Sequence, residues 1–380
     1  MGKRKLAVVG ASYLQLPLVE KAQSMGLEVH CFAWREGAVC ADVADYFYPI
    51  STRDEDAILS KCEEIGIDGI CTIASDVATL TVDYVADKMH LPGNPENYAQ
   101  VCTNKYLMRQ CFFANGVPSP RFVEVAQEKD KGKCDELSYP LIVKPTDRSG
   151  SRGVEKVYDK EQLQQAITRA WNESFCHQAI VEEFVGGSEV SVESISYKGK
   201  HHILQITDKV TTGEPFFVEL EHHQPSNLPS DIQQRIRAIV LKALDALHIC
   251  NGASHSELKI TKDGDIKVIE IGARMGGDFI GSDLVQLSTG YDFVRGVIEV
   301  ALGTFEEPLI SKHLYSGVFF LSKETSAYVL PIIKNAKKYP EVVRADIEDT
   351  VLRNIESSAD RSGYFIYQSE KGRFVIDEKR

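Results

Sequence analysis

Apolar and polar positions in the first part of the chain alternate between two patterns. Residues 5–10 form a largely apolar run ending in glycine, and residues 28–33 form a second run. Between them, residues 17–25 repeat apolar positions at helical spacing. Short apolar runs joined by an amphipathic helix are typical of buried parallel strands with a crossover connection. The chain is therefore predicted to open with a strand–helix–strand unit.

The same alternation continues beyond this unit. We predict a helix near residues 54–65, a strand at 69–73 and a helix near 77–89. The run Leu-Pro-Gly-Asn-Pro at residues 91–95 ends the pattern, because proline and glycine interrupt helices and strands. These elements predict a Rossmann-like α/β domain over residues 1–98. The loop at residues 10–15 lacks the G-x-G-x-x-G spacing, which argues against a nicotinamide or flavin site.

After this domain, helical and strand-like patterns mix, so the chain is α/β with an α+β part. Helices are predicted near residues 97–114, 160–171, 230–247, 283–287 and 293–302, and strands near 121–125, 139–145, 179–185, 188–193 and 202–207. From about residue 313, two strand-like runs (316–321 and 363–367) flank a helical run at 332–337. This last segment shows no pattern that indicates chemistry.

A strand and loop at residues 268–278 combine a carboxylate with a guanidinium. Glu270 lies in the strand, and Arg274 follows in a glycine-bounded loop. The Asp-Gly signal within residues 261–265 predicts a hairpin that would place Glu257 on the neighbouring strand. Two carboxylates in one cleft need a cation, and hard oxygen ligands suit Mg²⁺. The alternative is two solvated strand charges and an ordinary loop arginine.

A second candidate site begins at Lys144, at the end of the predicted strand 139–145. The small, flexible residues that follow can fold over an anion with their backbone N–H groups. The loop residues concerned are Ser149, Gly150, Ser151 and Gly153. Taken alone, this loop is equally well explained as a surface turn.

The predicted strand 179–185 ends in a glycine break, after which an alternating strand begins with Glu189. Backbone groups at such a strand end can bind the edge of an adenine, and Glu189 can accept hydrogen bonds from ribose hydroxyls. The alternative is a hairpin with exposed acids. Further on, Glu219, Glu221, His222 and His223 lie close together, but they do not form the H-E-x-x-H helix of a zinc enzyme.

Composition narrows the class of protein. The net charge of −12 argues against a nonspecific nucleic-acid-binding protein, because such a protein needs a basic surface. No apolar run approaches the length of a membrane span, and the run at residues 6–9 is too short for a signal-peptide core. The nine cysteines form no C-x-x-C pair, so we expect reduced thiols and a cytoplasmic protein.

Taken in order, these pieces resemble the ATP-grasp superfamily. The order is an α/β domain, a first lysine at Lys105, Lys144 before proline, a glycine–serine loop, a hinge strand, and two metal-type glutamates. The resemblance implies a pre-ATP-grasp domain at residues 1–98, an ATP-grasp domain at 99–305 and a small C-terminal α+β segment at 306–380. Within the ATP-grasp domain, the small lobe would cover about residues 115–184 and the large lobe about residues 185–305.

The resemblance also implies roles for individual residues. Lys105 and Lys144 would neutralise ATP phosphates, and the glycine–serine loop would close over them. The adenine and ribose would contact Glu182, Glu183, Phe184, Val185 and Glu189. Glu257 and Glu270 would hold Mg²⁺, with Mn²⁺ as a second candidate. Arg274 would stabilise the transferred phosphoryl group or grip the substrate carboxylate.

One position departs from the family pattern. The second metal glutamate is usually followed by isoleucine, asparagine, proline and arginine, and the asparagine also contacts metal. Here the run is Ile271, Gly272, Ala273 and Arg274, so Gly272 offers no side-chain ligand. This difference leaves the geometry of a second metal position open.

Within the superfamily, the chain is most similar to carboxylate–amine ligases of the L-amino acid (dipeptide) ligase type. The resemblance rests on Glu219 and His222, which fit a substrate-lining Glu-x-x-His element, and on Arg274, Gly276 and Gly277. It implies an acylphosphate mechanism with small carboxylate and amine substrates, in a protein that could form a homodimer. The alternatives are a bicarbonate-using or carbamoyl-phosphate-like enzyme, a purine-pathway ligase, and a nucleotide-binding protein without catalysis.

Overall fold

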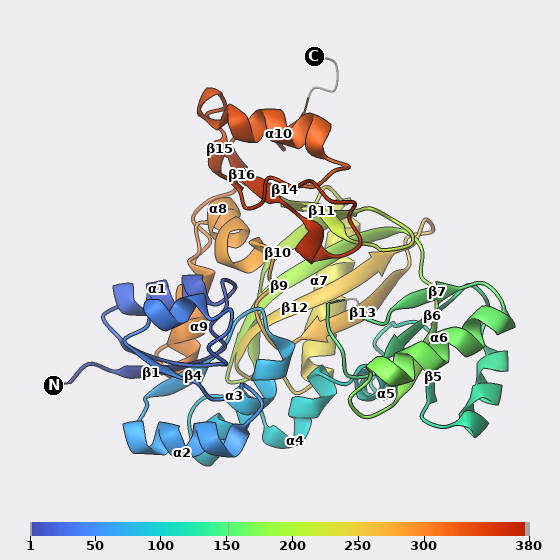
Figure 1. Cartoon of the computed structure of the whole chain (residues 1–380), viewed down its shortest axis with the longest axis horizontal. Coiled ribbons are helices and arrows are strands. Elements are labelled where there is room, and N and C mark those ends of the chain that lie inside the picture. Colours follow the sequence, from blue (N-terminus) through green and yellow to red (C-terminus); the bar gives the residue numbers. More distant parts are fainter. Residues whose placement is uncertain (1, 151, 377–380) are drawn as a thin grey trace.

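The computed structural model describes residues 2–150 and 152–376. The N-terminal part is a parallel sheet in the order β3-β2-β1-β4 (Figure 1). Its strands are β1 (Lys5–Val9), β2 (Glu28–Phe32), β3 (Tyr46–Tyr48) and β4 (Gly69–Cys71), and its helices are α1 (Leu16–Ser24), α2 (Glu55–Ile65) and α3 (Asp76–Lys88). The predicted strand–helix–strand opening is confirmed.

A small lobe follows, drawn in green in Figure 1. Its antiparallel sheet has the order β5-β8-β6-β7. The strands are β5 (Phe122–Val125), β6 (Leu141–Pro145), β7 (Glu155–Val157) and β8 (Ala179–Glu183). Helix α6 (Lys160–Glu173) packs on this sheet because Leu163, Ile167 and Trp171 recur at helical spacing and are buried against it.

The centre of the molecule is an eight-stranded antiparallel sheet in the order β13-β12-β9-β10-β11-β14-β16-β15. The strands are β9 (Ser188–Tyr197), β10 (Lys200–Thr211), β11 (Glu219–Gln224), β12 (Gly252–Ile260), β13 (Ile266–Gly272), β14 (Tyr315–Leu321), β15 (Val342–Ile347) and β16 (Gly363–Ser369). Apolar residues of β9, β12 and β13 pack in one core with helices α5 (Lys105–Ala114) and α7 (Ser230–Ala246). The opposite face of these strands carries the charged residues described below.

The C-terminal segment extends this sheet, because β14 hydrogen-bonds to β11 and β16 to β14. Polar and aromatic residues on one sheet face can therefore line a site that runs across both regions. The division of the chain at residue 305 stays a prediction.

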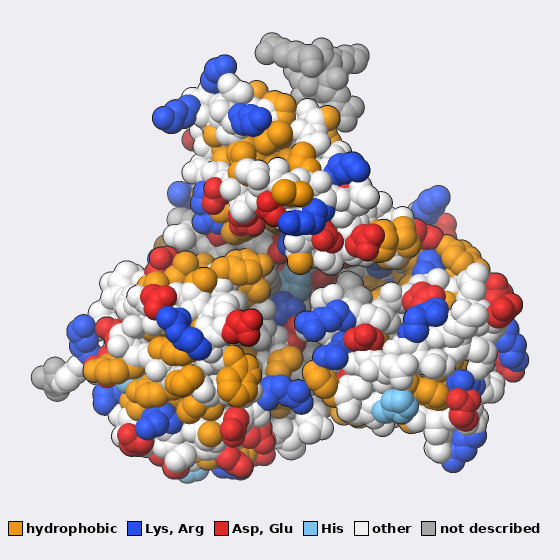
Figure 2. All heavy atoms as spheres, in the orientation of Figure 1, with side chains coloured by type: hydrophobic (Ala, Val, Ile, Leu, Met, Phe, Trp, Pro, Cys, Tyr) orange, Lys and Arg blue, Asp and Glu red, His pale blue; other side chains and the backbone are white. Residues whose placement is uncertain are grey.

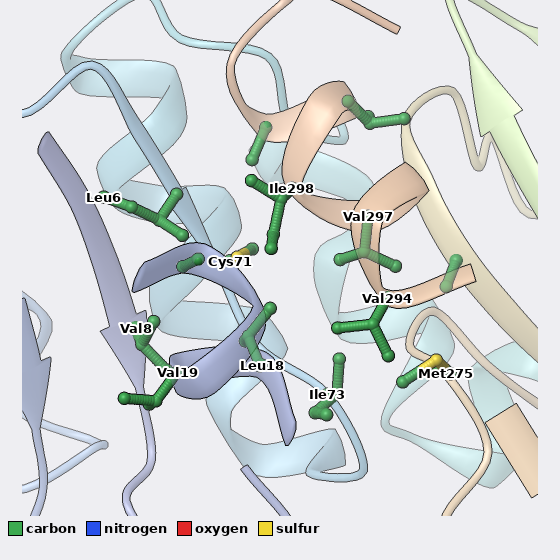
Figure 3. Packing of buried hydrophobic residues seen from close by; sticks show 14 of the residues in the cluster. Leu6, Val8, Leu18, Val19, Cys71, Ile73, Met275, Val294, Val297 and Ile298 are labelled. Atoms are coloured by element: carbon green, nitrogen blue, oxygen red, sulfur yellow. The ribbon is translucent and has the colours of Figure 1, made fainter. Parts of the chain in front are cut away.

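The N-terminal domain and the central sheet are joined by a shared core. Helix α9 (Phe293–Ala301) packs against α1 and β4, and Val294, Val297 and Ile298 lie in one cluster with Leu6 and Leu18 (Figure 3). Met275, from the loop after β13, belongs to the same cluster. This packing fixes the loop of Arg274 against the N-terminal domain.

Several predicted elements differ from the structure. The single helix expected at residues 97–114 is interrupted, because the Asn104 side chain accepts the N–H groups of Tyr106 and Leu107 and starts α5 anew. The helix expected at 332–337 is α10 (Ser326–Lys334), whose internal Pro331 masked the pattern. The stretch 283–287 spans the end of a π-helical turn (Ile280–Leu284) and the start of α8 (Val285–Thr289).

Strands β3, β7, β11 and β15 were not predicted. Strands β3 and β7 have three residues each, and charged residues interrupt β11 and β15. The mixed α/β fold itself is confirmed. Within the described residues, no helix is long and apolar enough to cross a membrane.

Candidate active site

The hairpin β12–β13 brings Glu257 and Glu270 directly opposite each other, as the sequence predicted. Each carboxylate pairs with its own lysine. Lys209 Nζ lies 2.7 Å from Glu257 Oε1, and Lys105 Nζ lies 2.8 Å from Glu270 Oε1. The two glutamates therefore form the centre of a network of alternating charges.

Lys105 is the first residue of α5 and is buried. Besides its bond to Glu270, its ammonium donates to the Arg148 carbonyl at 2.6 Å. Its backbone N–H donates to the Thr146 carbonyl at 2.7 Å. Lys105 thus connects the start of α5, the glycine–serine loop and strand β13.

Lys144, on β6, is held by Glu182 of the neighbouring strand β8, with Nζ 2.7 Å from Oε2. Arg109 reaches the other oxygen of Glu182 at 2.5 Å. Burial lowers the pKa of Lys144, although Glu182 opposes this shift. Burial would raise the pKa of Glu182, but Arg109 and Lys144 outweigh it and the pKa is lowered. Two cations for one carboxylate leave positive charge that an anion can neutralise.

The glycine–serine loop starts from a fixed point. Arg148 donates from Nε to the Glu173 carbonyl and lies 3.9 Å from the centre of the Phe175 ring. Gly150 and Gly153 have φ of 68° and 69°, which favours glycine. Ser151 lies outside the described residues. The structure places Ser149, Gly150 and Gly153 between β6 and β7, beside the Lys105 contact.

The segment after β8 crosses from the small lobe to the central sheet. Its first N–H groups are occupied, since Glu183 donates to the Arg121 carbonyl and Phe184 to the Pro140 carbonyl, both at 3.0 Å. Lys156 Nζ lies 3.6 Å from the centre of the Phe184 ring. Val185 is half-buried. This is the segment that the resemblance assigns to adenine.

Lys209 is enclosed by three glutamates on the face of the central sheet. Its ammonium lies 2.8 Å from Glu189, 3.2 Å from Glu219 and 2.7 Å from Glu257. Its side chain is only 3% exposed. Burial lowers the pKa of Lys209, but the glutamates raise it well above the usual value, so the ammonium stays charged.

Oxygen atoms of Glu189, Glu219 and Glu257 lie within 4.8 Å of one another, close enough to hold one metal ion. Lys259 Nζ also lies 2.7 Å from Glu189, so three carboxylates face two ammonium groups and leave negative charge, and this donor set suits a hard cation. Glu270 is not one of this trio. Glu257 therefore belongs both to the metal pair predicted from the sequence, with Glu270, and to the trio in the structure.

The sequence did not indicate Lys209, which lies near the end of a strand predicted to stop at residue 207. One signal was available. Lys209 continues the alternation of residues 205 and 207, so an extended strand would have placed it on the polar face.

Arg274 pairs with Asp76, a residue of the N-terminal domain that sequence reasoning did not single out. Nε lies 2.8 Å from Oδ1, and Nη2 lies 3.2 Å from Oδ2. Burial would raise the pKa of Asp76, but Arg274 outweighs it and the pKa is lowered. A Cβ atom on Gly272 would lie 2.7 Å from Asp76 Oδ1. The absent side chain at position 272 therefore gives room to this ion pair.

The glycine pair after Arg274 lies against buried charged groups. Gly276 donates its N–H to Glu193 at 3.0 Å, and Glu193 also bonds to His255 Nδ1. A Cβ on Gly276 would lie 2.7 Å from that nitrogen, whereas one on Gly277 would make only an ordinary contact with Ala74 at 3.7 Å. Burial lowers the pKa of His255, but the neighbouring glutamates raise it to about 9.

His222 lies on β11, opposite Lys209 of β10. Its side chain is 1% exposed, and neither ring nitrogen has a hydrogen-bond partner among the described residues. The nearest charge is Asp278, 3.9 Å from Nε2 to Oδ2. Burial lowers the pKa of His222, and Asp278 only partly offsets this, so the imidazole is neutral at neutral pH.

A cleft opens beside these residues. It is lined by Tyr13, Gly277, Asp278, Arg344, Arg361 and Tyr364, among others. Figure 2 shows the molecule hollowed between the N-terminal domain, the small lobe and the C-terminal segment. The sequence indicated no chemistry in the C-terminal segment, yet Arg344 and Arg361 face this cleft.

Comparison with known proteins identifies relatives of the central region. Residues 137–283 match the family model described as ATP-grasp domain. D-alanine–D-alanine ligase of Methylibium petroleiphilum is 28% identical over 222 residues, which cover 55% of this chain and 68% of that protein. Alanine–anticapsin ligase of Bacillus subtilis is 27% identical over 261 residues, which cover 60% of this chain and 55% of the relative.

Among solved structures, the L-amino acid ligase from Bacillus licheniformis is similar over nearly the whole chain. It has a TM-score of 0.81 and 26% identity, and the match covers 98% of this chain and 94% of that chain. The sequence relatives match over shorter stretches. The chain spans 54% of the length of the uncharacterized protein y4rH of Sinorhizobium fredii and 55% of the alanine–anticapsin ligase. The resemblance to the ATP-grasp superfamily, and within it to carboxylate–amine ligases, is confirmed.

Proposed function

We propose that the chain, in which residues 137–283 match the ATP-grasp domain model, is an ATP- and Mg²⁺-dependent carboxylate–amine ligase that forms ADP, phosphate and a C–N bond. The observation that carries the proposal is the buried network of three lysines and their glutamates. Lys105, Lys144 and Lys209 each contact at least one glutamate carboxylate. Such pairs are expensive to bury and add little stability by themselves, so we interpret them as a ligand site.

Binding of ATP with Mg²⁺ would exchange partners within this network. The triphosphate would take over Lys105 and Lys144, and Mg²⁺ would bind the glutamates around Lys105 and Lys209. Glu182 would keep Arg109, and Lys209 would share its carboxylates with the metal ion, so the site can open for the nucleotide without leaving a buried ion unpaired.

The residues that would hold Mg²⁺ are Glu257, with Glu270 on one side and Glu189 and Glu219 on the other. Their oxygen donors fit a hard cation, and the ion would screen phosphate charge during transfer. Glu189 is also the residue that the resemblance assigns to the ribose. Phe184 and Val185 would lie against the adenine.

The reaction would proceed in two steps. A carboxylate oxygen of the substrate attacks the γ-phosphorus of ATP, the bond between this phosphorus and the bridging oxygen breaks, and ADP leaves. The amine nitrogen of the second substrate then attacks the acyl carbon, the bond from this carbon to the phosphate oxygen breaks, and phosphate leaves. The nitrogen loses one proton in this step.

Two side chains suit these steps. Arg274, a fixed fork beside the predicted metal position, would stabilise the phosphoryl group or orient the attacking carboxylate. His222 is neutral, and its ring nitrogens have no hydrogen-bond partner in the described part of the chain, so it would accept the proton of the amine. The three named relatives are ligases of alanine or of L-amino acids, which makes an amino acid or a similar small carboxylate our proposed substrate.

Trapping the acylphosphate with hydroxylamine tests this function. The protein would be incubated with MgATP, hydroxylamine and a panel of small carboxylates, and both ADP and the acyl hydroxamate would be measured. We expect hydroxamate with an amino acid, and its loss in Glu270→Gln. The surface variant Glu63→Gln, on α2, serves as the matched control.

Other outcomes would replace the proposal. ADP formation that needs only bicarbonate would favour a carboxylase or carbamoyl-phosphate-like reaction. ATP binding without ADP formation for any carboxylate would indicate a nucleotide-binding protein. Equal activity of Glu270→Gln and Glu63→Gln would show that the carboxylate network does not take part.

A further inference from the structure

The C-terminal segment contributes an ion pair to the cleft. Arg361 Nη1 lies 2.8 Å from Asp278 Oδ2, and Nη2 lies 2.8 Å from Oδ1. Nε of Arg361 donates to the Ser358 carbonyl at 3.0 Å, and the guanidinium lies 3.9 Å from the centre of the Phe320 ring. Both members are thus held in one geometry, and both line the cleft.

This pair retains unused hydrogen-bonding capacity. A guanidinium has five N–H donors, and the contacts of Arg361 use three of them. A carboxylate has about four acceptor positions, and Arg361 occupies two of those on Asp278. The Asp278 side chain is 26% exposed, so it is accessible from the cleft. A ligand can therefore add to the pair without breaking it.

A buried polar group beside the pair also lacks a partner. His222 is 1% exposed, has no hydrogen bond from either ring nitrogen among the described residues, and lies 3.9 Å from Asp278. Leaving such a group unsatisfied is costly, which points to a ligand or water at this position. The orphaned imidazole and the open side of Asp278 would meet the same polar group.

The rest of the lining balances the charge. Arg344 lies 4.7 Å from the centre of the Phe279 ring and 5.3 Å from that of Tyr364, and Glu348 lies in the same wall. The cleft thus presents two guanidinium groups and two carboxylates around aromatic rings. Such a wall suits a ligand that carries both charges, and disfavours an apolar or singly charged one.

We propose that Asp278 and Arg361 recognise the acyl acceptor as a zwitterion, with its amine at Asp278 and His222 and its own carboxylate at Arg361. The inference rests on the proposed ligase function and makes the C-terminal segment a specificity element for the second substrate. The acceptor would arrive as an ammonium held by Asp278 and would release one proton to water in the cleft to become the free amine. The amine nitrogen would then attack the acyl carbon, phosphate would leave, and His222 Nε2 would accept the second proton.

The test compares acceptors that differ only in the carboxylate. Glycine, L-alanine, L-glutamate and L-lysine would each be offered as the free acid and as the α-amide, with the carboxylate substrate that gives a hydroxamate. We expect the wild-type protein to prefer at least one free acid over its amide by at least tenfold in kcat/KM. In Arg361→Gln this preference should fall towards one, chiefly through a higher KM for the acid.

Hydroxylamine separates the two proposals, because it traps the acylphosphate and carries no carboxylate. In Arg361→Gln and Asp278→Asn, the loss with the amino acid acceptor should exceed the loss with hydroxylamine by at least tenfold. Arg353→Gln, which removes an exposed Arg–Asp pair of the same segment, should keep the wild-type preference. Thermal unfolding of each variant would check that it folds.

Three results would overturn the inference. Wild-type protein that uses amides as well as acids needs no carboxylate on its acceptor. Equal losses with amino acid and hydroxylamine would assign Arg361 a structural role. If hydroxamate forms but none of the amino acids serves as an acceptor, the second substrate is not a zwitterion. If no carboxylate gives hydroxamate, the ligase function itself is removed.

Discussion

Three buried lysines and the glutamates around them determine how charge is distributed over the site. Lys144 is balanced by one glutamate that also serves Arg109, whereas Lys209 is surrounded by three. One part of the site therefore has excess positive charge and the other excess negative charge. This polarity matches a nucleotide whose phosphates lie beside a divalent cation.

Replacing Lys209 by glutamine tests the negative part. The variant leaves Glu189, Glu219 and Glu257 without their common counter-charge. Without metal, we expect the free energy of unfolding to fall by about 3 kcal/mol, which is the lower end of the range for breaking a buried ion pair. The loss lies at this end because the glutamates keep contact with water. Saturating Mg²⁺ should raise the melting temperature of the variant more than that of the wild type.

Urea unfolding would measure the loss in unfolding free energy, and thermal unfolding with and without MgCl₂ would measure the shift in melting temperature. Lys160→Gln breaks an exposed pair with Asp135 and should cost less than about 1 kcal/mol, with no Mg²⁺ dependence. A Mg²⁺ response no larger in Lys209→Gln than in the wild type would show that the three glutamates do not hold the ion.

The protonation of His222 gives a pH prediction. Its pKa lies below the usual 6.5 because burial disfavours the imidazolium. The base form therefore persists as the pH falls below 6.5, and the acidic limb of kcat should lie below that value. His222→Gln should lower kcat about a hundredfold and remove this limb, as expected for loss of a general base.

Rates measured between pH 5 and 8 would decide this point. His313→Gln, an exposed histidine for which the wild-type profile should persist, is the control. The same acidic limb in His222→Gln would assign the titration to another group.

At the scale of elements, the break before α5 positions a functional side chain. The cap by Asn104 makes Lys105 the first helical residue, where its ammonium reaches Glu270 and the Arg148 carbonyl. The backbone N–H of Lys105 donates to the Thr146 carbonyl, which fixes the first residue of α5. In an uninterrupted helix from residue 97, Lys105 would lie in the helix interior and would lose this bond. The correction to the predicted helix is therefore also part of the site.

Asn104→Ala tests this arrangement. Loss of the cap should cost about 1 kcal/mol of stability and raise KM for ATP, because Lys105 loses its fixed position. Asp159→Ala removes the equivalent cap of α6, whose side chain accepts the N–H of Gln162. We expect both variants to be destabilised equally and KM for ATP to rise only in Asn104→Ala. If KM rises equally in both variants, the effect is due to lower stability and not to the position of Lys105.

The elements that the sequence predicted well are those with a local signal. The hairpin between Glu257 and Glu270 follows from an Asp-Gly turn and two alternating strands, and its pairing is observed. The partners that were missed are distant in sequence. Asp76 meets Arg274 only because α9 and Met275 pack on the N-terminal sheet, and Arg361 meets Asp278 only because β14 and β16 extend the central sheet. No local pattern encodes such contacts.

On the scale of the whole molecule, the site is assembled from every region of the chain. The N-terminal domain supplies Asp76, the small lobe Lys144, the central sheet its glutamates, and the C-terminal segment Arg361. The ion pair between Asp76 and Arg274 links the N-terminal domain to the loop that follows β13, the strand of Glu270. Position 272 decides whether that link can form.

Restoring the family asparagine tests which of two roles position 272 has. In Gly272→Asn the new Cβ would lie 2.7 Å from Asp76 Oδ1 and displace it from Arg274. We expect kcat/KM to fall at least about tenfold, or 1.4 kcal/mol.

Asp76→Ala should cost a similar amount, and the double variant should lose little more than either single one, because both changes remove the same pair. Gly132→Asn, where a Cβ meets nothing within 4 Å, controls for the added side chain. If the losses multiply instead, or if Gly272→Asn needs less Mg²⁺ than the wild type, the asparagine acts as a metal ligand and the pair with Asp76 does not govern the site.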